Sequence, residues 1–202
     1  SMTTVDVGLA AERGYEIRIG AGLLAQAGTA ISAVARSKRV VVITQPPIEK
    51  RWGAPLLDSL AQAGLDTSVI TYPAGERHKH LTTIARLYER LYNLPGIDRK
   101  TLLIALGGGV VGDMVGYVAA TYLRGMDYVQ VPTTLLAMVD SSVGGKTGVD
   151  FLEGKNLIGA FHQPRLVLAD TNTLTTLPAR EVRSGLAEVV KYGIIWDPAL
   201  LE

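Results

Sequence analysis

Short apolar runs alternate with longer amphipathic segments along most of this chain, and this alternation limits the fold more than any other feature. Continuous apolar runs at residues 39–44 and 101–106 are typical of strands buried on both faces of a parallel sheet. Further strands are expected at residues 15–19, 67–72, 128–131 and 165–169. Helices are expected at residues 23–34, 55–63 and 81–91, and from the glycine cluster near residue 109 to about 123. The pattern predicts an α/β fold, a Rossmann-like mainly parallel sheet with helices on both faces.

The pattern changes after Pro178, where a single amphipathic helix begins. No other segment of the chain is evident as its packing partner. We therefore interpret residues 178–202 as the first helix of a missing helical carboxyl-terminal domain, and residues 1–177 as the α/β domain.

The composition of the chain excludes several classes of site and partner. The absence of cysteine excludes disulfides and thiolate metal sites and is compatible with a cytoplasmic protein. A net charge of +1 gives no electrostatic reason to expect nucleic acid or an anionic membrane as a partner. No apolar run approaches the ~20 residues that a membrane span needs.

A glycine cluster follows the expected strand at residues 101–106. Gly107, Gly109 and Gly112 satisfy G-x-G-x-x-G between a strand and a helix, where main-chain N–H groups and the helix N-terminus can hold a pyrophosphate. Alternatively, the glycines only allow close packing of strand and helix. The acidic residue expected about twenty positions later is missing, because Asp127 precedes the next strand. A dinucleotide is therefore expected here, but not in the usual chain order.

Residues 132–156 combine glycines with lysines and hydroxyl groups. Gly144-Gly145-Lys146-Thr147 imitates a P-loop, but Asp140 occupies the position of the first P-loop glycine, which excludes a Walker-type NTPase. The segment is interpreted as loops that project from the carboxyl ends of strands and bind phosphate or carboxylate oxygens. The alternative is a set of solvated surface loops.

On the last helix, Glu188 and Lys191 share a face. They are either a surface ion pair or a zinc-binding carboxylate with a lysine beside it. The three histidines, His78, His80 and His162, show no metal-binding spacing, and exposure is expected for His78 and His80.

Seven segments in this order resemble the 3-dehydroquinate synthases, within the sugar phosphate cyclases, from about residue 75 to the end of the chain. They are GERHK at 75–79, GGGVVGD at 107–113, YLRG at 122–125, VPTTLL at 131–136, VDSSVGGKTG at 139–148, GKNLIGAF at 154–161 and GLAEVVKYG at 185–193.

The resemblance implies an enzyme that binds NAD and a divalent metal, Zn²⁺ or Co²⁺. Such a lyase converts 3-deoxy-D-arabino-heptulosonate 7-phosphate to 3-dehydroquinate and phosphate in the shikimate pathway, which leads to chorismate and the aromatic amino acids. An alcohol is oxidised, phosphate is eliminated, the ketone is reduced again, and the opened ring closes by an aldol step. The resemblance also implies a cytoplasmic homodimer in the full-length enzyme.

The resemblance assigns roles to individual residues. It implies that Asp140, Lys146 and Asn156 lie between nicotinamide and substrate, that Arg124 binds phosphate across a dimer, that Lys191 binds substrate and that Glu188 is a metal ligand. The implied cofactor contacts are Gly75, Glu76, Lys79, Gly108, Gly109, Val110, Val111, Gly112, Asp113, Thr133, Thr134, Lys146, Lys155, Thr173, Leu174, Thr175 and Thr176.

Two departures from the family pattern affect what is expected. Gln45 stands where many relatives carry Asp or Asn to hold the adenine ribose. The two zinc-binding histidines of the family belong to its carboxyl-terminal domain, so this chain alone is expected to be inactive. The alternatives are a related cyclase acting on another sugar phosphate, an enzyme like the glycerol or iron-dependent alcohol dehydrogenases, and a pure binding module.

Overall fold

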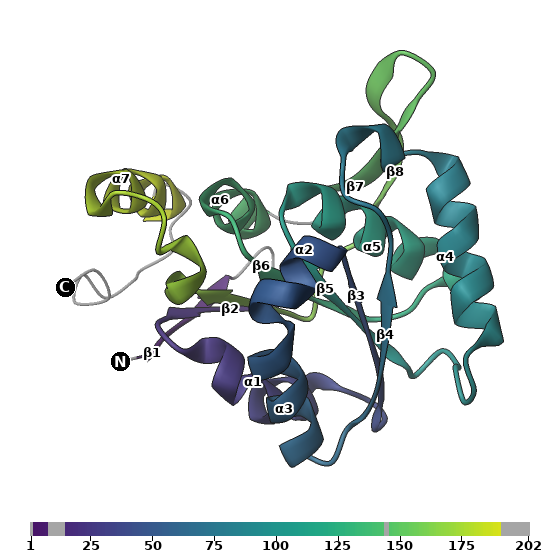
Figure 1. Ribbon diagram of the computed structural model, residues 1–202, viewed down its shortest axis with the longest axis horizontal. Helices are drawn as coiled ribbons and strands as arrows, with labels where there is room; N and C mark the ends of the chain where they lie inside the picture. Colours follow the sequence, from purple (N-terminus) through teal and green to yellow (C-terminus); the bar gives the residue numbers. More distant parts are fainter. Residues whose placement is uncertain (1, 8–14, 144–145, 191–202) are drawn as a thin grey trace.

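A seven-stranded sheet lies between two layers of helices in the computed structural model, which describes residues 2–7, 15–143 and 146–190 (Figure 1). The strand order is β1-β2-β9-β6-β5-β3-β4, and every neighbouring pair is parallel except β1 with β2. The strands are β1 (Met2–Val7), β2 (Tyr15–Gly20), β3 (Arg39–Thr44), β4 (Asp66–Thr71), β5 (Leu102–Gly107), β6 (Tyr128–Pro132) and β9 (Leu166–Asp170). The predicted mainly parallel α/β fold is confirmed, whereas β1 was not anticipated.

Helices cover both faces of the sheet because successive strand side chains point to opposite sides. On β3, Val40 and Val42 pack with α1 and α3, whereas Val41 and Ile43 pack with α4 and α5. In Figure 1, α1 and α3 lie below the sheet, α5 to α7 lie above it, and α4 lies to its right beside β4. The helices are α1 (Ala27–Val34), α2 (Pro46–Ile48), α3 (Ala54–Gln62), α4 (Leu81–Asn93), α5 (Gly109–Thr121), α6 (Leu135–Val143) and α7 (Ala179–Val190). Among the described residues, none of the helices is both long and apolar enough to cross a bilayer.

An antiparallel hairpin of β7 (Lys146–Phe151) and β8 (Gly154–Phe161), together with the helix α6, replaces most of the loops expected at residues 132–156. The loop prediction was wrong here because the glycines belong to strands that approach closely: a Cβ on Gly159 would lie 2.0 Å from the Thr147 carbonyl oxygen. Val149 is fully buried in the core beside α5, which anchors the hairpin to the domain.

The helix expected after Pro178 is present as α7, but the expectation that it lacks a partner was wrong. Val182 is buried in the same cluster as Met138 of α6, and Gly185 allows close approach, since a Cβ there would lie 2.4 Å from Leu135. The described part of α7 is therefore packed on the α/β core. The domain boundary at residues 177 and 178 stays a prediction.

Candidate functional site

The glycine turn joins β5 to α5 at the carboxyl edge of the sheet. A Cβ on Gly107 would lie 2.6 Å from Cγ2 of Val111, so this glycine serves close packing of strand and helix. A Cβ on Gly109 would meet no heavy atom within 4 Å. Packing inside the protein therefore does not explain Gly109, and its missing side chain leaves the first turn of α5 open. Close packing of strand and helix is thus confirmed at Gly107, whereas binding of a pyrophosphate at Gly109 stays a prediction.

The first helical turn provides main-chain donors toward this open space. Within α5 the amide of Gly112 bonds to the Gly108 carbonyl at 3.1 Å, which is the start of the helical ladder. Earlier N–H groups of a helix have no intrahelical acceptor, and the aligned peptide dipoles place partial positive charge there. The turn can accordingly bind an anionic group such as a diphosphate.

A groove of about 590 Å³ runs along the glycine turn. Its walls come from the loop before α4, from the turn after β6 and from the segment after β9, so that strand ends far apart in sequence meet at one edge. Eleven predicted cofactor contacts line it: Gly75, Glu76, Gly108, Gly109, Val110, Val111, Thr133, Thr134, Thr173, Leu174 and Thr176. Thr175 is exposed and is not among the lining residues.

Gln45, Arg51 and Trp52 also line the groove, and the last two were not anticipated. Gln45 follows β3, which neighbours β5 in the sheet. In dinucleotide-binding sheets the residue at the adenine ribose follows the strand beside the glycine turn. Here that strand precedes β5 in the chain, which explains why no acidic residue was found about twenty positions later. Arg51 and Trp52 belong to the π-helical turn Glu49–Gly53, for which the sequence carried no signal.

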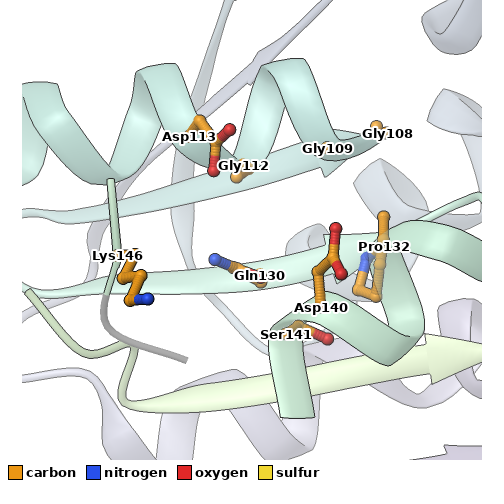
Figure 2. Close-up of a pocket in the computed structure, with 12 residues that line it drawn as sticks. Gly108, Gly109, Gly112, Asp113, Gln130, Pro132, Asp140, Ser141 and Lys146 are labelled. Atoms are coloured by element: carbon orange, nitrogen blue, oxygen red, sulfur yellow. The ribbon is translucent and has the colours of Figure 1, made fainter. Parts of the chain in front are cut away.

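A second cavity of about 350 Å³ adjoins the groove and shares Gly108 and Gly109 with it. Figure 2 shows Asp113 on α5 across from Asp140 on α6, with Lys146 at the start of β7. Gln130 of β6, which was not predicted, forms part of the same lining. Desolvation raises the pKa of Asp140. Two carboxylates and one ammonium thus face a cavity at the end of the groove.

A third cavity of about 330 Å³ continues from the second and shares Asp113 and Lys146 with it. Asn156 of β8 contributes to its lining, together with glycines of the hairpin. The three cavities therefore form a continuous series from the groove to the hairpin. They bring together Asp140, Lys146 and Asn156, the residues expected between a nicotinamide and a substrate.

Lys79 connects two side chains that line the cavities, one on α5 and one on β8. Its side chain is 6% exposed, and its Nζ lies 2.9 Å from Oδ2 of Asp113 and 2.6 Å from Oδ1 of Asn156. Burial raises the pKa of Asp113, an effect that the hydrogen bond and charge of Lys79 partly oppose. Lys79 does not line the groove itself, so its predicted role as a direct cofactor contact remains untested.

Asp150 of β7 joins the hairpin to the loop before α4. Its Oδ1 accepts the Asn156 backbone N–H at 2.9 Å, and its Oδ2 lies 3.3 Å from Lys155 Nζ. Lys155 Nζ is also 3.7 Å from Glu76 Oε1 at the groove. The Asn156 amide and the Lys155 ammonium lower the pKa of the Asp150 carboxyl. Asp150 was not predicted because the glycine-rich segment hid the strand that carries it.

Arg124 lies away from the three cavities. It is exposed in the turn that follows α5, and the 13 residues of that helix span about 20 Å from the glycine turn. Leu123, Arg124 and Gly125 have φ of 52°, 64° and 122°, so two residues with side chains adopt the left-handed region. Within one copy of the chain, the predicted phosphate-binding arginine does not reach the predicted substrate residues.

The predicted metal site cannot be assembled from the described residues. No three His, Asp or Glu side chains in residues 2–7, 15–143 and 146–190 are grouped as metal ligands. Glu188 belongs to α7, but its side chain lies outside the described part, as does the whole of Lys191. His78 and His80 are half-buried rather than exposed as expected.

Comparison with known proteins identifies the family of this chain. The N-terminal family of 3-dehydroquinate synthase matches residues 69–184, more than half of the chain. A 3-dehydroquinate synthase of Pelotomaculum thermopropionicum is 53% identical over 196 residues, which make up 97% of this chain and 52% of the relative. The chain spans about half the length of the curated relatives it matches.

Two solved structures share the fold and are more than 30% identical to this chain. A 2-deoxy-scyllo-inosose synthase complexed with carbaglucose-6-phosphate, NAD⁺ and Co²⁺ has a TM-score of 0.79 and 31% identity, covering 94% of this chain and 50% of that one. A 2-epi-5-epi-valiolone synthase from Streptomyces hygroscopicus with NAD⁺ and Zn²⁺ bound has a TM-score of 0.73 and 35% identity, covering 90% of this chain and 49% of that one. An open glycine turn on the fifth strand, polar cavities beside it and a match over residues 69–184 lead to one conclusion: this chain belongs to the 3-dehydroquinate synthase family, to whose N-terminal part it corresponds.

Proposed function

We propose that this chain is the NAD-binding part of a 3-dehydroquinate synthase, which converts 3-deoxy-D-arabino-heptulosonate 7-phosphate to 3-dehydroquinate and phosphate. The observation that carries the proposal is the open turn at Gly109, placed where a dinucleotide groove meets a cavity lined by Asp140 and Lys146. A diphosphate fits this position because main-chain donors face it and no side chain fills it.

The chain's residues divide between cofactor and substrate. Gly75, Glu76 and Thr173 to Thr176 would contact the nucleotide together with the turn from Gly108 to Asp113, while Thr133 and Thr134 close the groove from the side of β6. Bound NAD would supply the hydride acceptor for oxidation of a substrate alcohol, and the resulting ketone would make the neighbouring C–H acidic. Lys146 would hold negative charge of the substrate in the cavity it shares with Asp140, where a carboxylate of raised pKa can accept or return a proton.

Lys79, Lys155 and Asn156 would order the far end of the same cavity series. Asn156 can donate its amide N–H groups to substrate oxygens while its Oδ1 accepts from Lys79. Lys155 is 68% exposed, so we propose that it contacts the cofactor through a mobile ammonium rather than through a fixed pair.

The metal of the proposed enzyme, Zn²⁺ or Co²⁺, would need Glu188 and further ligands, because the described residues do not fit a metal ion by themselves. Lys191 would bind substrate beside Glu188. Residues 1–177 would form the NAD-binding domain and residues 178–202 the start of a helical domain. We accordingly propose that this chain alone has no turnover and that the full enzyme acts in the cytoplasm.

A homodimer is proposed for the full-length enzyme. Arg124 is exposed at the opposite end of α5 from the glycine turn, so a substrate phosphate could meet it only if a second copy supplied it. A glycerol or alcohol dehydrogenase-like enzyme is disfavoured by the family match over residues 69–184, whereas a cyclase for another sugar phosphate would use the same groove.

The test combines a ligand titration with one substitution. NAD at about one hundred times its dissociation constant should stabilise the chain by about 2.7 kcal/mol. That stabilisation would raise Tm by roughly 5–10 °C for a domain of this size. Gly109→Ala should leave the unliganded Tm equal or slightly higher, because alanine favours the helix, yet should abolish most of the shift. Adenosine, which lacks the diphosphate, is the matched ligand and should bind both proteins equally.

Two results would count against the proposal. A melting curve that does not move with NAD would refute NAD binding by this chain. An equal shift in Gly109→Ala would show that NAD does not bind at the glycine turn. A separate assay follows phosphate release from 3-deoxy-D-arabino-heptulosonate 7-phosphate, where turnover by this chain alone would refute the proposed need for further residues.

A further inference from the structure

The carboxylate of Asp150 is buried at a junction between three predicted site residues. The residue is 3% exposed, although it lies one position before the exposed end of β7. Its backbone N–H donates to the Lys79 carbonyl at 2.8 Å, its Oδ1 accepts from the Asn156 N–H at 2.9 Å, and its Oδ2 faces Lys155 at 3.3 Å. None of the three cavities described above includes Asp150 in its lining. Any influence on a ligand must therefore pass through its neighbours.

Asn156 needs an external contact to keep its conformation. Its φ is 52°, a left-handed value that a residue with a side chain adopts only when its surroundings favour it, although Asn tolerates it better than most. The hairpin register is irregular between Val149 and Phe151, directly opposite this residue. The Asp150 carboxylate accepts the Asn156 backbone N–H at 2.9 Å, and a hydrogen bond to a charged group is among the stronger ones.

The conformation of Asn156 sets the position of a buried ammonium. Asn156 Oδ1 accepts from Lys79 Nζ at 2.6 Å, and the same ammonium lies 2.9 Å from Asp113, which lines two of the cavities. The Nδ2 group of Asn156 makes no hydrogen bond within the described part of the chain. It is therefore available to an oxygen of a ligand in the cavity that Asn156 lines.

The pair with Lys155 does not explain the burial of Asp150. The Lys155 side chain is 68% exposed, and exposed ion pairs contribute little. The contact with the Asn156 backbone is a well-formed hydrogen bond of 2.9 Å, and an amide oxygen at position 150 can accept it as a carboxylate oxygen does.

We propose that Asp150 is a positioning residue for the cleft: it holds Asn156 in the left-handed conformation, and Asn156 in turn fixes the Lys79 ammonium against Asp113. The inference rests on the proposed function, since the ligand it serves is the NAD and sugar phosphate of that site. Because an acceptor is what matters, asparagine should replace aspartate at this position and alanine should not.

The experiment compares Asp150→Ala and Asp150→Asn, with Glu153→Ala as the matched control. Glu153 is exposed in the same hairpin, and its side chain makes no hydrogen bond or ion pair within the described residues. Backbone amide exchange at Asn156 is measured by NMR without ligand, and the NAD dissociation constant is measured by calorimetry. Asp150→Ala should speed exchange of the Asn156 amide and weaken NAD binding, each by about tenfold or more. Asp150→Asn and Glu153→Ala should stay within about threefold of the unsubstituted chain.

Each outcome decides the inference. An Asn156 amide that is equally protected in Asp150→Ala, or equally exposed in Asp150→Asn, would overturn the positioning role. Loss of protection in Asp150→Ala with unchanged NAD affinity would show that Asp150 only stabilises the hairpin. If Asp150→Ala does not fold, the test rests on Asp150→Asn. Amide protection at Asn156 and NAD affinity close to those of the unsubstituted chain would then support the inference, and loss of both would overturn it. If the unsubstituted chain binds no NAD, the proposed function fails, while amide exchange still tests whether Asp150 holds Asn156.

Discussion

A methyl group added at Gly116 should push the hairpin away from α5. Gly116 lies in the middle of α5, and a Cβ there would be 2.4 Å from Cγ2 of Thr147 on β7, with the Tyr128 hydroxyl at 3.1 Å. Thr147 cannot easily turn aside, because it is β-branched and its Oγ1 donates to the Ala160 carbonyl at 2.8 Å. Gly116→Ala therefore forces either a strained rotamer or a shift of the strand that carries Lys146 and Asp150.

The magnitude follows from two opposing effects. Overpacking of a filled interior costs about 1–3 kcal/mol, whereas replacing glycine by alanine inside a helix gains about 1 kcal/mol. We expect a net loss of up to about 2 kcal/mol and a Tm lowered by up to roughly 8 °C. Thr147→Ser removes the clashing Cγ2 but keeps the hydroxyl, and by itself should cost about 1 kcal/mol for the lost methyl group.

Urea unfolding of the four proteins in this double-mutant cycle gives the coupling. The double variant should be close to the unsubstituted chain, with a coupling of about 1 kcal/mol or more in favour of the pair. Independent sites add to within about 0.5 kcal/mol, so additivity of Gly116→Ala and Thr147→Ser would refute the contact between α5 and the hairpin. The same would follow if Gly116→Ala alone were more stable than the starting chain.

Four further outcomes are expected. Because burial raises the pKa of Asp113, the folded state binds more protons there than the unfolded state between the ordinary and the raised value, so this group's contribution to stability falls as pH rises through that window. Lys79→Met removes the charge that opposes the shift, so the Asp113 carboxyl carbon should titrate at higher pH in that variant by NMR, and an equal or lower midpoint would contradict the ion pair. Leu56→Ala, at a fully buried position of α3, should cost about 2–5 kcal/mol in urea unfolding, and a loss below about 1 kcal/mol would place α3 outside the core. NAD should change the fluorescence of Trp52, which lines the groove, and the change should disappear in Trp52→Phe; a persisting change would place NAD elsewhere.

The elements predicted correctly from the sequence are those whose burial follows a regular pattern of residues along the element. The strands at residues 39–44 and 101–106 are buried on both faces, so an unbroken apolar run identifies them without knowledge of their partners. Gly64, which directly follows the helix expected at residues 55–63, adopts a left-handed φ of 76°, as is typical of a glycine at a helix end. The glycine turn was recognisable because strand, glycines and helix adjoin in the sequence.

The elements that were missed depend on contacts between distant segments. β7 and β8 contain Gly148 and Gly159, and glycines weaken the alternating pattern by which a strand is recognised. Both segments form strands because α5 packs on them and Val149 enters the core. The helical region that follows β3 begins at Pro46, earlier than expected, because proline is tolerated in a first turn and therefore hides a helix start. The groove residues Arg51 and Trp52 lie in that hidden part.

The pairing of β2 with β9 determines when this domain can become functional during synthesis. Glu16 pairs with Leu166, 150 residues later, and Asp170 receives the amides of Gly22 and Leu24 at 3.0 Å. At roughly 5–20 residues per second, a ribosome adds that length in about 8–30 s, during which the early strand has an unpaired edge. The groove wall from Thr173 to Leu177 emerges later still. The edge of β2 therefore stays open to unintended strand pairing during this interval, and the groove can be complete only after β9 has joined β2.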